Sequence, residues 1–263
     1  MSTLMLRLRR SVVVLPALSA LVLLWPVTQP AVAEETEARQ IVQSAIDQWR
    51  GVSSRSDMRM SIRRPDWERT MTMRAWTKGD EQSLVRVLEP SKDRGNGTLT
   101  DDDSMWTFSP RVNRVIKIPS SMMNQSWMGS DFSNKDVARA DDIVDQYTHT
   151  LLGRREEEGV TIFEIESIPL EDAAVVWGKE VMLIRDDYVV AEHRFYDQDN
   201  QLVKTLRSLE IGEMGGRMLA LRQRMQKVDA PGEWTEIEVL SADYEIDVSD
   251  RVFTLSNLRN PRD

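Results

Sequence analysis

Residues 58–75 have the sequence MRMSIRRPDWERTMTMRA, and this stretch decides the fold. Apolar and polar residues alternate over 58–62 and again over 71–75, on either side of the Pro65-Asp66 turn. Successive side chains of a β-strand point to opposite faces, so alternation with a period of two gives each strand one apolar face. The stretch therefore predicts an antiparallel hairpin with one apolar face.

The same pattern continues along the rest of the chain. Turn-forming residues separate the apolar runs, and Gly215-Gly216 is the clearest two-residue hairpin turn. About a dozen strands in hairpin order, with two helical segments, predict a mainly β (α+β) fold with a single antiparallel sheet that curls to bury its inner face. The further predicted strands are 83–88, 97–99, 105–108, 112–118, 160–168, 180–185, 188–196, 202–211, 217–227 and 233–242.

Two segments lack the strand pattern and are expected to cover the sheet. Residues 37–50 carry apolar side chains at helical spacing and predict an amphipathic helix that ends near Trp49. Residues 119–147 combine apolar and small polar residues, and Ser133 with Asp136 predicts a capping box. We expect this second segment, the lid, to lie across the sheet with its apolar residues Met122, Met123, Trp127, Met128 and Phe132.

The N-terminus has the order of a secretory signal peptide. Three arginines precede an apolar run over residues 12–26, and Ala31-Val32-Ala33 forms a small-residue cleavage site. The run is shorter than the roughly twenty residues that a spanning helix needs. We therefore expect residues 1–33 to be a cleaved signal peptide and residues 34–263 to form one periplasmic domain. Because the chain has no cysteine, we expect no disulfide, thiol catalysis or lipidated N-terminal cysteine.

The charge of the chain argues against nucleic acid as a partner. The formal net charge is −9, and removal of the three signal-peptide arginines would change it to −12. Binding to nucleic acid depends on basic side chains that neutralise phosphates. An acidic chain of this kind is expected to act on other partners.

Several motifs resemble a known family. They are MWTFSPRVNRV at residues 105–115 and WMGSDF at residues 127–132, followed by Asp136. KDRGNGTL at residues 92–99 and Phe253-Thr254-Leu255 extend the similarity over most of the mature chain. Together they resemble the outer-membrane lipoprotein-sorting family of the LolA/LolB-like superfamily.

This resemblance implies an unclosed antiparallel β half-barrel, covered by short helices, whose hollow apolar face accepts acyl chains of lipids or lipoproteins. It also implies an association with an inner-membrane transporter of the resistance-nodulation-division (RND) type. The carrier's cavity arginine has no definite counterpart here, and Arg86 is the candidate. Flexible methionines suit an adaptable pocket, although core packing stays open for each of them, as it does for the tryptophans. The candidate cavity and lid residues are Trp49, Met58, Met60, Met71, Met73, Arg86, Trp106, Met122, Met123, Trp127, Met128 and Phe132.

The sequence predicts neither catalysis nor a cofactor. Asp131 and Asp136 have no nucleophile or histidine nearby, and His149 and His193 lack the spacing of a zinc hydrolase. Residues 101–103 are acidic but lack the calcium-loop pattern, so a hairpin tip is expected there. Two functions remain: a carrier that shields acyl chains, or an accessory protein with a filled core that docks on an envelope transporter.

Overall fold

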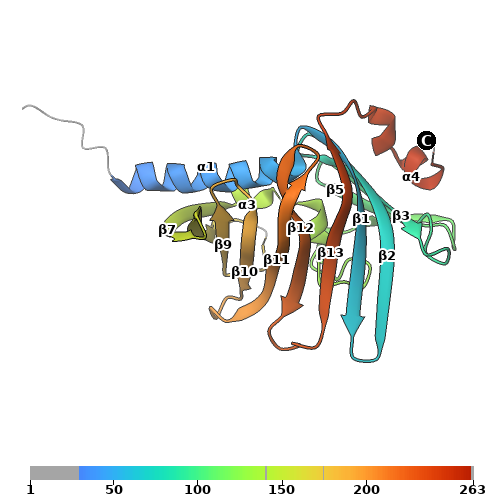
Figure 1. Cartoon of the computed structure of the whole chain (residues 1–263). Coiled ribbons are helices and arrows are strands. Elements are labelled where there is room, and N and C mark those ends of the chain that lie inside the picture. Colours follow the sequence, from blue (N-terminus) through green and yellow to red (C-terminus); the bar gives the residue numbers. More distant parts are fainter. Residues whose placement is uncertain (1–29, 140, 174, 262–263) are drawn as a thin grey trace, which may run out of the picture.

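A single antiparallel sheet dominates the computed structural model, which describes residues 30–139, 141–173 and 175–261. The thirteen strands lie in the order β6-β5-β4-β3-β2-β1-β13-β12-β11-β10-β9-β8-β7, and the sheet does not close into a barrel (Figure 1). The fold class predicted from the sequence is confirmed. The signal-peptide prediction falls on residues 1–33, of which 1–29 lie outside the described residues. The strands are β1 (Ser53–Arg64), β2 (Trp67–Lys78), β3 (Gln82–Glu89), β4 (Gly97–Asp101), β5 (Ser104–Ser109), β6 (Arg114–Ile118), β7 (Tyr147–Glu157), β8 (Val160–Pro169), β9 (Lys179–Arg185), β10 (Val190–Tyr196), β11 (Leu202–Met214), β12 (Arg217–Lys227) and β13 (Trp234–Tyr244).

The first and last strands meet in the middle of the sheet. β1 pairs with β13, with Met60 opposite Ile237, and every other neighbour in the sheet is also a neighbour in sequence. The two edges are therefore β6 and β7, which are consecutive along the chain. The predicted lid ended at residue 147, but Tyr147 begins β7, so the lid is residues 119–146; it joins these edges and contains η1 (Ser120–Met122), α2 (Asn134–Ala138) and α3 (Asp142–Asp145).

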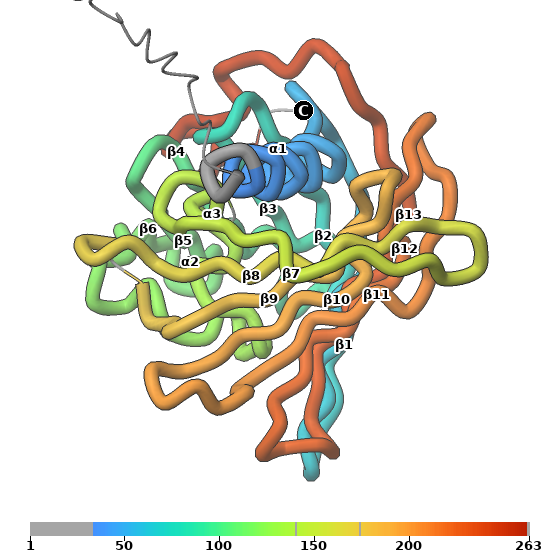
Figure 2. Tube along the Cα trace, turned by 90° about the vertical axis from the view of Figure 1, so that its left-hand side faces the viewer, coloured from blue at the N-terminus to red at the C-terminus, as the bar shows by residue number. Residues whose placement is uncertain are grey.

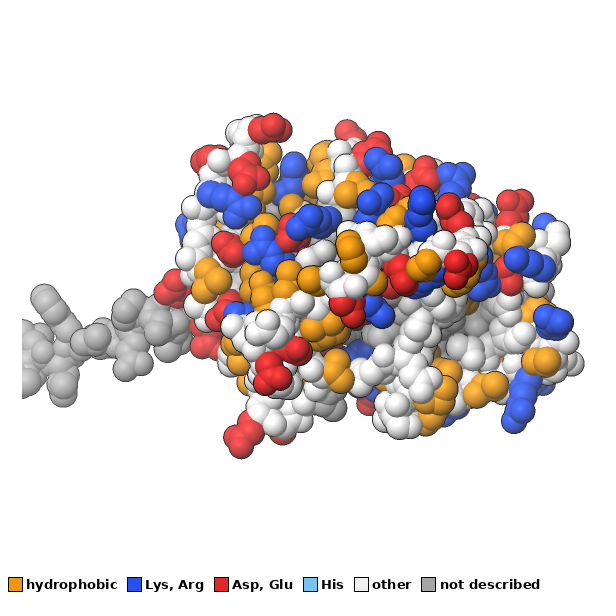
Figure 3. Space-filling view, turned by 90° about the horizontal axis from the view of Figure 1, so that it is seen from below, with side chains coloured by type: hydrophobic (Ala, Val, Ile, Leu, Met, Phe, Trp, Pro, Cys, Tyr) orange, Lys and Arg blue, Asp and Glu red, His pale blue; other side chains and the backbone are white. Residues whose placement is uncertain are grey.

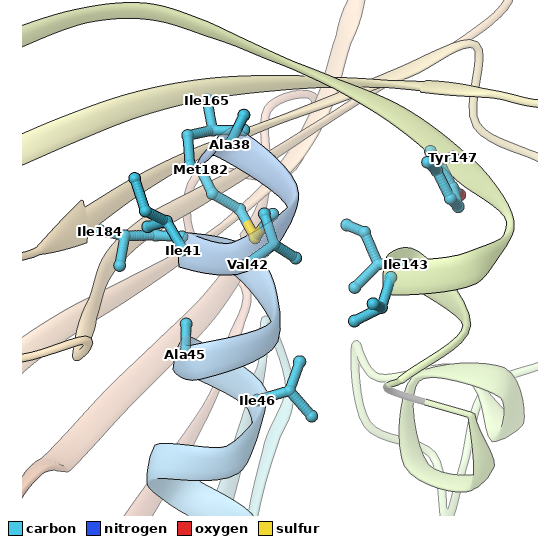
Figure 4. Close-up of a cluster of buried hydrophobic side chains, with 11 residues drawn as sticks. Ala38, Ile41, Val42, Ala45, Ile46, Ile143, Tyr147, Ile165, Met182 and Ile184 are labelled. Atoms are coloured by element: carbon cyan, nitrogen blue, oxygen red, sulfur yellow. The ribbon is translucent and has the colours of Figure 1, made fainter. Parts of the chain in front are cut away.

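Helix α1 (Pro30–Arg50) fills the concave side near β7 to β9. The helix begins at Pro30, whereas the predicted start was Glu37. Figure 2 shows α1 beside α3, and its apolar stripe packs against β8, β9 and α3 (Figure 4). Gly51 ends the helix with a φ of +66°, a conformation that glycine adopts readily. The residues of this cluster are Ala38, Ile41, Val42, Ala45, Ile46, Ile143, Val144, Tyr147, Ile165, Met182 and Ile184.

The hairpin read from residues 58–75 is β1 and β2. Met58 lies opposite Met73 and Met60 opposite Met71, so the alternating apolar residues share one face. Met60, Met71 and Met73 are fully buried in a second cluster that includes Trp127 of the lid. The lid therefore packs directly on one end of the concave face, and the capping box of Ser133 and Asp136 is confirmed at the start of α2.

The C-terminal segment covers part of the outer face. It contains η2 (Asp250–Phe253) and α4 (Leu255–Arg259), which pack on β3, β4 and β5. The cluster consists of Leu84, Leu99, Phe108, Val248, Phe253 and Leu258. This cover explains why β3 and β4 are buried on both faces.

Strand β7 was missing from the predicted strands. Residues 152–157 are exposed, although their backbone pairs with β8. Their sequence is LGRREE, in which apolar and polar residues do not alternate. An edge strand rich in charge is a common protection against pairing with other chains. The alternating burial that reveals a strand is therefore limited to the start of β7, where Tyr147 and His149 are buried, and is absent over 152–157.

Among the described residues, no helix has the length and apolar character needed to cross a membrane. Seen from below, the surface mixes hydrophobic side chains with basic and acidic ones (Figure 3).

Candidate functional site

A cavity of about 540 Å³ lies on the concave face, between α1, the lid and the sheet. Its position follows from the two buried clusters, because α1 fills the end near β7 to β9 and the lid fills the end near β1 to β5. The middle of the sheet, from β13 to β10, is left between them. The apolar wall there includes Phe195, Leu206, Leu219, Ala220, Met225, Ile237 and Val239.

Three of the residues predicted from the sequence line this cavity. Trp49 lies at the end of α1, Met58 on β1 and Phe132 on the lid. Trp49 is about half exposed, at 45%. The structure therefore brings together one residue from each of the three parts that were expected to enclose a ligand.

The other predicted residues of the concave face lie under the lid and not on the cavity wall. Met60, Met71 and Met73 share the face of Met58, but Trp127 fills the space above them. The Trp127 indole Nε1 donates a hydrogen bond to Thr98 Oγ1 at 3.0 Å, which fixes the ring. Met123 and Met128 pack against the same cluster.

Three predicted residues point elsewhere. Arg86 lies on the opposite face of β3 from Val85 and Val87, and its Nη2 donates a hydrogen bond to the Asn257 carbonyl oxygen of α4 at 2.7 Å. Trp106 packs against the outer cluster below α4, on the same face as Leu99. These placements correct the expectation that Arg86 and Trp106 line the hollow, and the reason is the period-two alternation of their strands. Met122, in η1, is 37% exposed on the surface.

A hydrogen-bonded polar group interrupts the apolar wall near α3. The Tyr147 hydroxyl donates to Glu180 Oε1 at 2.6 Å, and His193 Nε2 lies 2.6 Å from Glu180 Oε2. Burial, and then the nearby Glu180 carboxylate, raises the pKa of Tyr147, so its hydroxyl keeps its proton. The His193 ring also stacks on Phe195, with ring centroids 4.1 Å apart. All four side chains line the cavity.

Two ion pairs connect the lid to the sheet beside the cavity. Arg64 at the end of β1 donates two hydrogen bonds, of 3.1 and 3.2 Å, to the Asp131 carboxylate, which also accepts one from Thr235 Oγ1 at 2.7 Å. On β11, Lys204 Nζ lies 2.7 Å from Asp136 Oδ2. Asp131 and Asp136 therefore hold the lid in place.

The arrangement is suited to binding an apolar ligand with a polar end. In the part of the chain that the structure describes, no group of three or more histidine or acidic side chains is arranged to hold a metal ion.

The hairpin tip predicted at residues 101–103 is confirmed, since β4 ends at Asp101 and β5 begins at Ser104.

Most of the cavity wall was not identified from the sequence. It comes from β9 to β13, and Met182, Phe195, Lys204, Leu206 and Met225 are examples. The alternation of these strands shows which residues share a face. Which part of that face stays uncovered depends on where α1 and the lid pack, and the alternation carries no signal for that.

Comparison of the sequence with known proteins places the chain in one family. A protein-family model described as "uncharacterized protein" matches residues 79–260, which is more than half of the chain. No curated protein sequence matches this chain significantly.

Three solved structures share the fold. A DUF1329 family protein from Desulfovibrio piger is 25% identical with a TM-score of 0.77, and the match covers 86% of this chain and 99% of that one. A putative outer membrane lipoprotein-sorting protein domain from Vibrio parahaemolyticus is 21% identical with a TM-score of 0.75, over 86% of this chain and 100% of that one. A LolA superfamily protein from Nitrosomonas europaea is 22% identical with a TM-score of 0.69, over 83% of this chain and 98% of that one.

Proposed function

Because this chain belongs to the protein family whose model matches residues 79–260, and shares its fold with a LolA superfamily protein and an outer membrane lipoprotein-sorting domain, we propose that it is a periplasmic carrier that holds acyl chains in its cavity. The cargo is a lipid or the acylated end of a lipoprotein. The protein shields the apolar chain from water during transfer and carries out no reaction on it.

The cavity is the observation that carries this proposal. Its volume of about 540 Å³ falls within the roughly 300–1,000 Å³ that is typical of small-ligand sites. Its wall is mainly aliphatic and aromatic, and burial of each methylene contributes about 0.8 kcal/mol. A partly enclosed chain of about ten methylenes can therefore bind with useful affinity after the cost of ordering it is subtracted.

Native mass spectrometry with lipid extraction tests the proposal on protein purified from the periplasm without detergent. We expect acyl species in near-stoichiometric amounts. An empty protein that also fails to take up a fluorescent fatty acid would contradict the carrier function.

A cavity-filling variant links the binding to this site. Ala220 lines the cavity from β12, whereas Ile168 of β8 is 40% exposed and lies outside the cavity lining. We expect Ala220→Trp to reduce uptake of the fluorescent fatty acid at least tenfold, because the indole occupies the space of the ligand. The control Ile168→Trp, which places an indole on the outside of the sheet, should bind as the wild type does, and equal binding by both variants would place the ligand elsewhere.

The second candidate is an accessory protein that docks on an envelope transporter. The filled cluster below the lid, where Trp127 covers Met60, Met71 and Met73, favours it, because part of the concave face has no room for cargo. An RND-type transporter is the partner that the family resemblance points to, for the carrier as well as for the accessory protein. Pull-down of such a transporter by protein that is free of lipid would support the accessory function.

A further inference from the structure

Two lysines lie side by side on the cavity wall. Lys204 of β11 is directly opposite Lys227 of β12 in the antiparallel register, and both line the cavity. Side chains that are directly opposite on neighbouring strands lie on the same face and within contact range. Like charges at such a pair destabilise the sheet unless an anion lies nearby.

The two lysines differ in their partners. Lys204 is almost completely buried, at 4% exposure, and it is paired with Asp136 of the lid. Its ammonium group also lies 4.7 Å from the centre of the Phe195 ring. Lys227 is exposed, and among residues 30–139, 141–173 and 175–261 it takes part in no ion pair within 4.0 Å.

The other basic side chains on the cavity wall already have acidic partners. Lys135 Nζ lies 3.1 Å from Asp142 Oδ2, and Arg139 Nη2 lies 3.1 Å from Asp103 Oδ1. Among the described residues of the cavity wall, Lys227 is thus the basic side chain that has no acidic partner within the protein, so it can pair with an anionic ligand.

The position of Lys227 relative to the apolar wall fits an amphiphile. Strand β12 starts beside α1, where Gln48 Nε2 donates a hydrogen bond to the Met218 carbonyl oxygen, and it ends at Lys227. Between these ends Ala220 and Met225 face the cavity. A chain that lies along β12 would therefore have its apolar part against these residues and its polar end at Lys227.

We propose that the cavity selects anionic amphiphiles and that Lys227, beside Lys204, binds the carboxylate or phosphate headgroup. This inference rests on the proposed carrier function. The formal net charge of −9 repels anions at long range, so attraction of an anionic headgroup has to come from a local cation such as Lys227.

The test compares cis-parinaric acid with its methyl ester, which has the same chain and no charge, by fluorescence titration at neutral pH. We expect the acid to bind more tightly than the ester to the wild type. In Lys227→Gln the acid should lose roughly two- to fivefold in affinity, as expected for loss of an exposed ion pair, and the ester should be unaffected. Lys92→Gln makes the same charge change on an exposed loop residue outside the cavity lining and should bind both probes as the wild type does.

The outcomes separate this inference from the carrier function. Equal affinity for acid and ester that Lys227→Gln leaves unchanged would overturn the headgroup site and keep the carrier. Failure to bind either probe would instead contradict the carrier function itself. Inorganic phosphate is expected not to displace the bound acid at millimolar concentration, and displacement would show a site for the free anion in place of a lipid headgroup.

Discussion

Replacement of Trp127 by alanine tests whether the lid is fixed on the sheet by its core contacts. Trp127 is 5% exposed and packs on Met60, Met71 and Met73. Removal of a buried tryptophan side chain costs about 3–5 kcal/mol, from lost burial and the cavity that is left. For a domain of this size the expected decrease in Tm is roughly 2–4 °C for each kcal/mol.

A milder substitution separates packing from hydrogen bonding. Trp127→Phe keeps most of the apolar ring but removes the donor to Thr98 Oγ1, an acceptor on a residue that is 1% exposed. Loss of a partner for one buried group costs about 1–3 kcal/mol. We therefore expect Trp127→Phe to be destabilised less than Trp127→Ala.

Equilibrium unfolding in urea, followed by far-ultraviolet circular dichroism, measures both variants. The matched control is Trp67→Ala, because Trp67 is 48% exposed at the end of the β1–β2 hairpin. We expect the control to lose less than about 1 kcal/mol, as surface substitutions usually do. If Trp127→Ala loses no more than Trp67→Ala, the lid is not anchored by Trp127 and the reasoning is refuted.

Three further predictions concern stability. The hydrogen bonds from Arg74 hold the pKa of Asp57 below its ordinary value. Asp57→Asn should therefore lower the free energy of unfolding at neutral pH by up to about 1 kcal/mol. Urea titrations should show that this difference between wild type and variant vanishes as the pH falls through the pKa of Asp57 in the folded state, because the wild-type carboxyl is then protonated and uncharged too. Burial lowers the pKa of His149, so the wild type should lose stability as the pH falls below about 6.5, where the unfolded state takes up a proton first, and His149→Gln should reduce this slope. A Cβ at Gly178 would lie 2.3 Å from the Asp197 carbonyl oxygen, so Gly178→Ala should lower stability by about 1–3 kcal/mol in the same assay, and a neutral effect would contradict the close approach.

The strands and the helix could be predicted because their patterns are local. The alternation over 58–62 and 71–75 predicted an antiparallel hairpin with one apolar face, and the structure confirms it, with Met60 opposite Met71. The stripe of α1 was visible for the same reason, since its apolar residues from Ala38 to Ile46 pack on an apolar surface. β7 was missed because its charged edge residues are exposed and have no apolar face.

The site was harder to predict because its location depends on what covers the sheet. Met58 and Met60 are two residues apart on one face of β1, and yet Met58 lines the cavity while Met60 lies under Trp127. No local pattern distinguishes the two methionines. Arg86 shows a different limit, because a basic residue on a central strand can be buried on the outer face when a distant segment, here Asn257 of α4, supplies the hydrogen-bond acceptor.

The topology gives the lid a particular relation to the cavity. Because β6 and β7 are both the edges of the sheet and consecutive strands, the segment that joins them has to cross the open side of the half-barrel. Its attachment is unequal along its length. Trp127 is held by a buried cluster, whereas Asp136 is held beside the cavity by the ion pair with Lys204.

This difference indicates where a ligand can enter at low cost. Withdrawal of Trp127 from its buried cluster would expose apolar side chains, and we expect it to cost about 3–5 kcal/mol, the same as removal of the side chain. Separation of Asp136 from Lys204 leaves a lysine that an anionic headgroup at the neighbouring Lys227 can neutralise in turn. We therefore expect the part of the lid around α2 to move for a ligand while Trp127 stays in place, so hydrogen exchange on binding should change at residues 134–138 and not at Trp127. Faster exchange at Trp127 in the bound state would contradict this order.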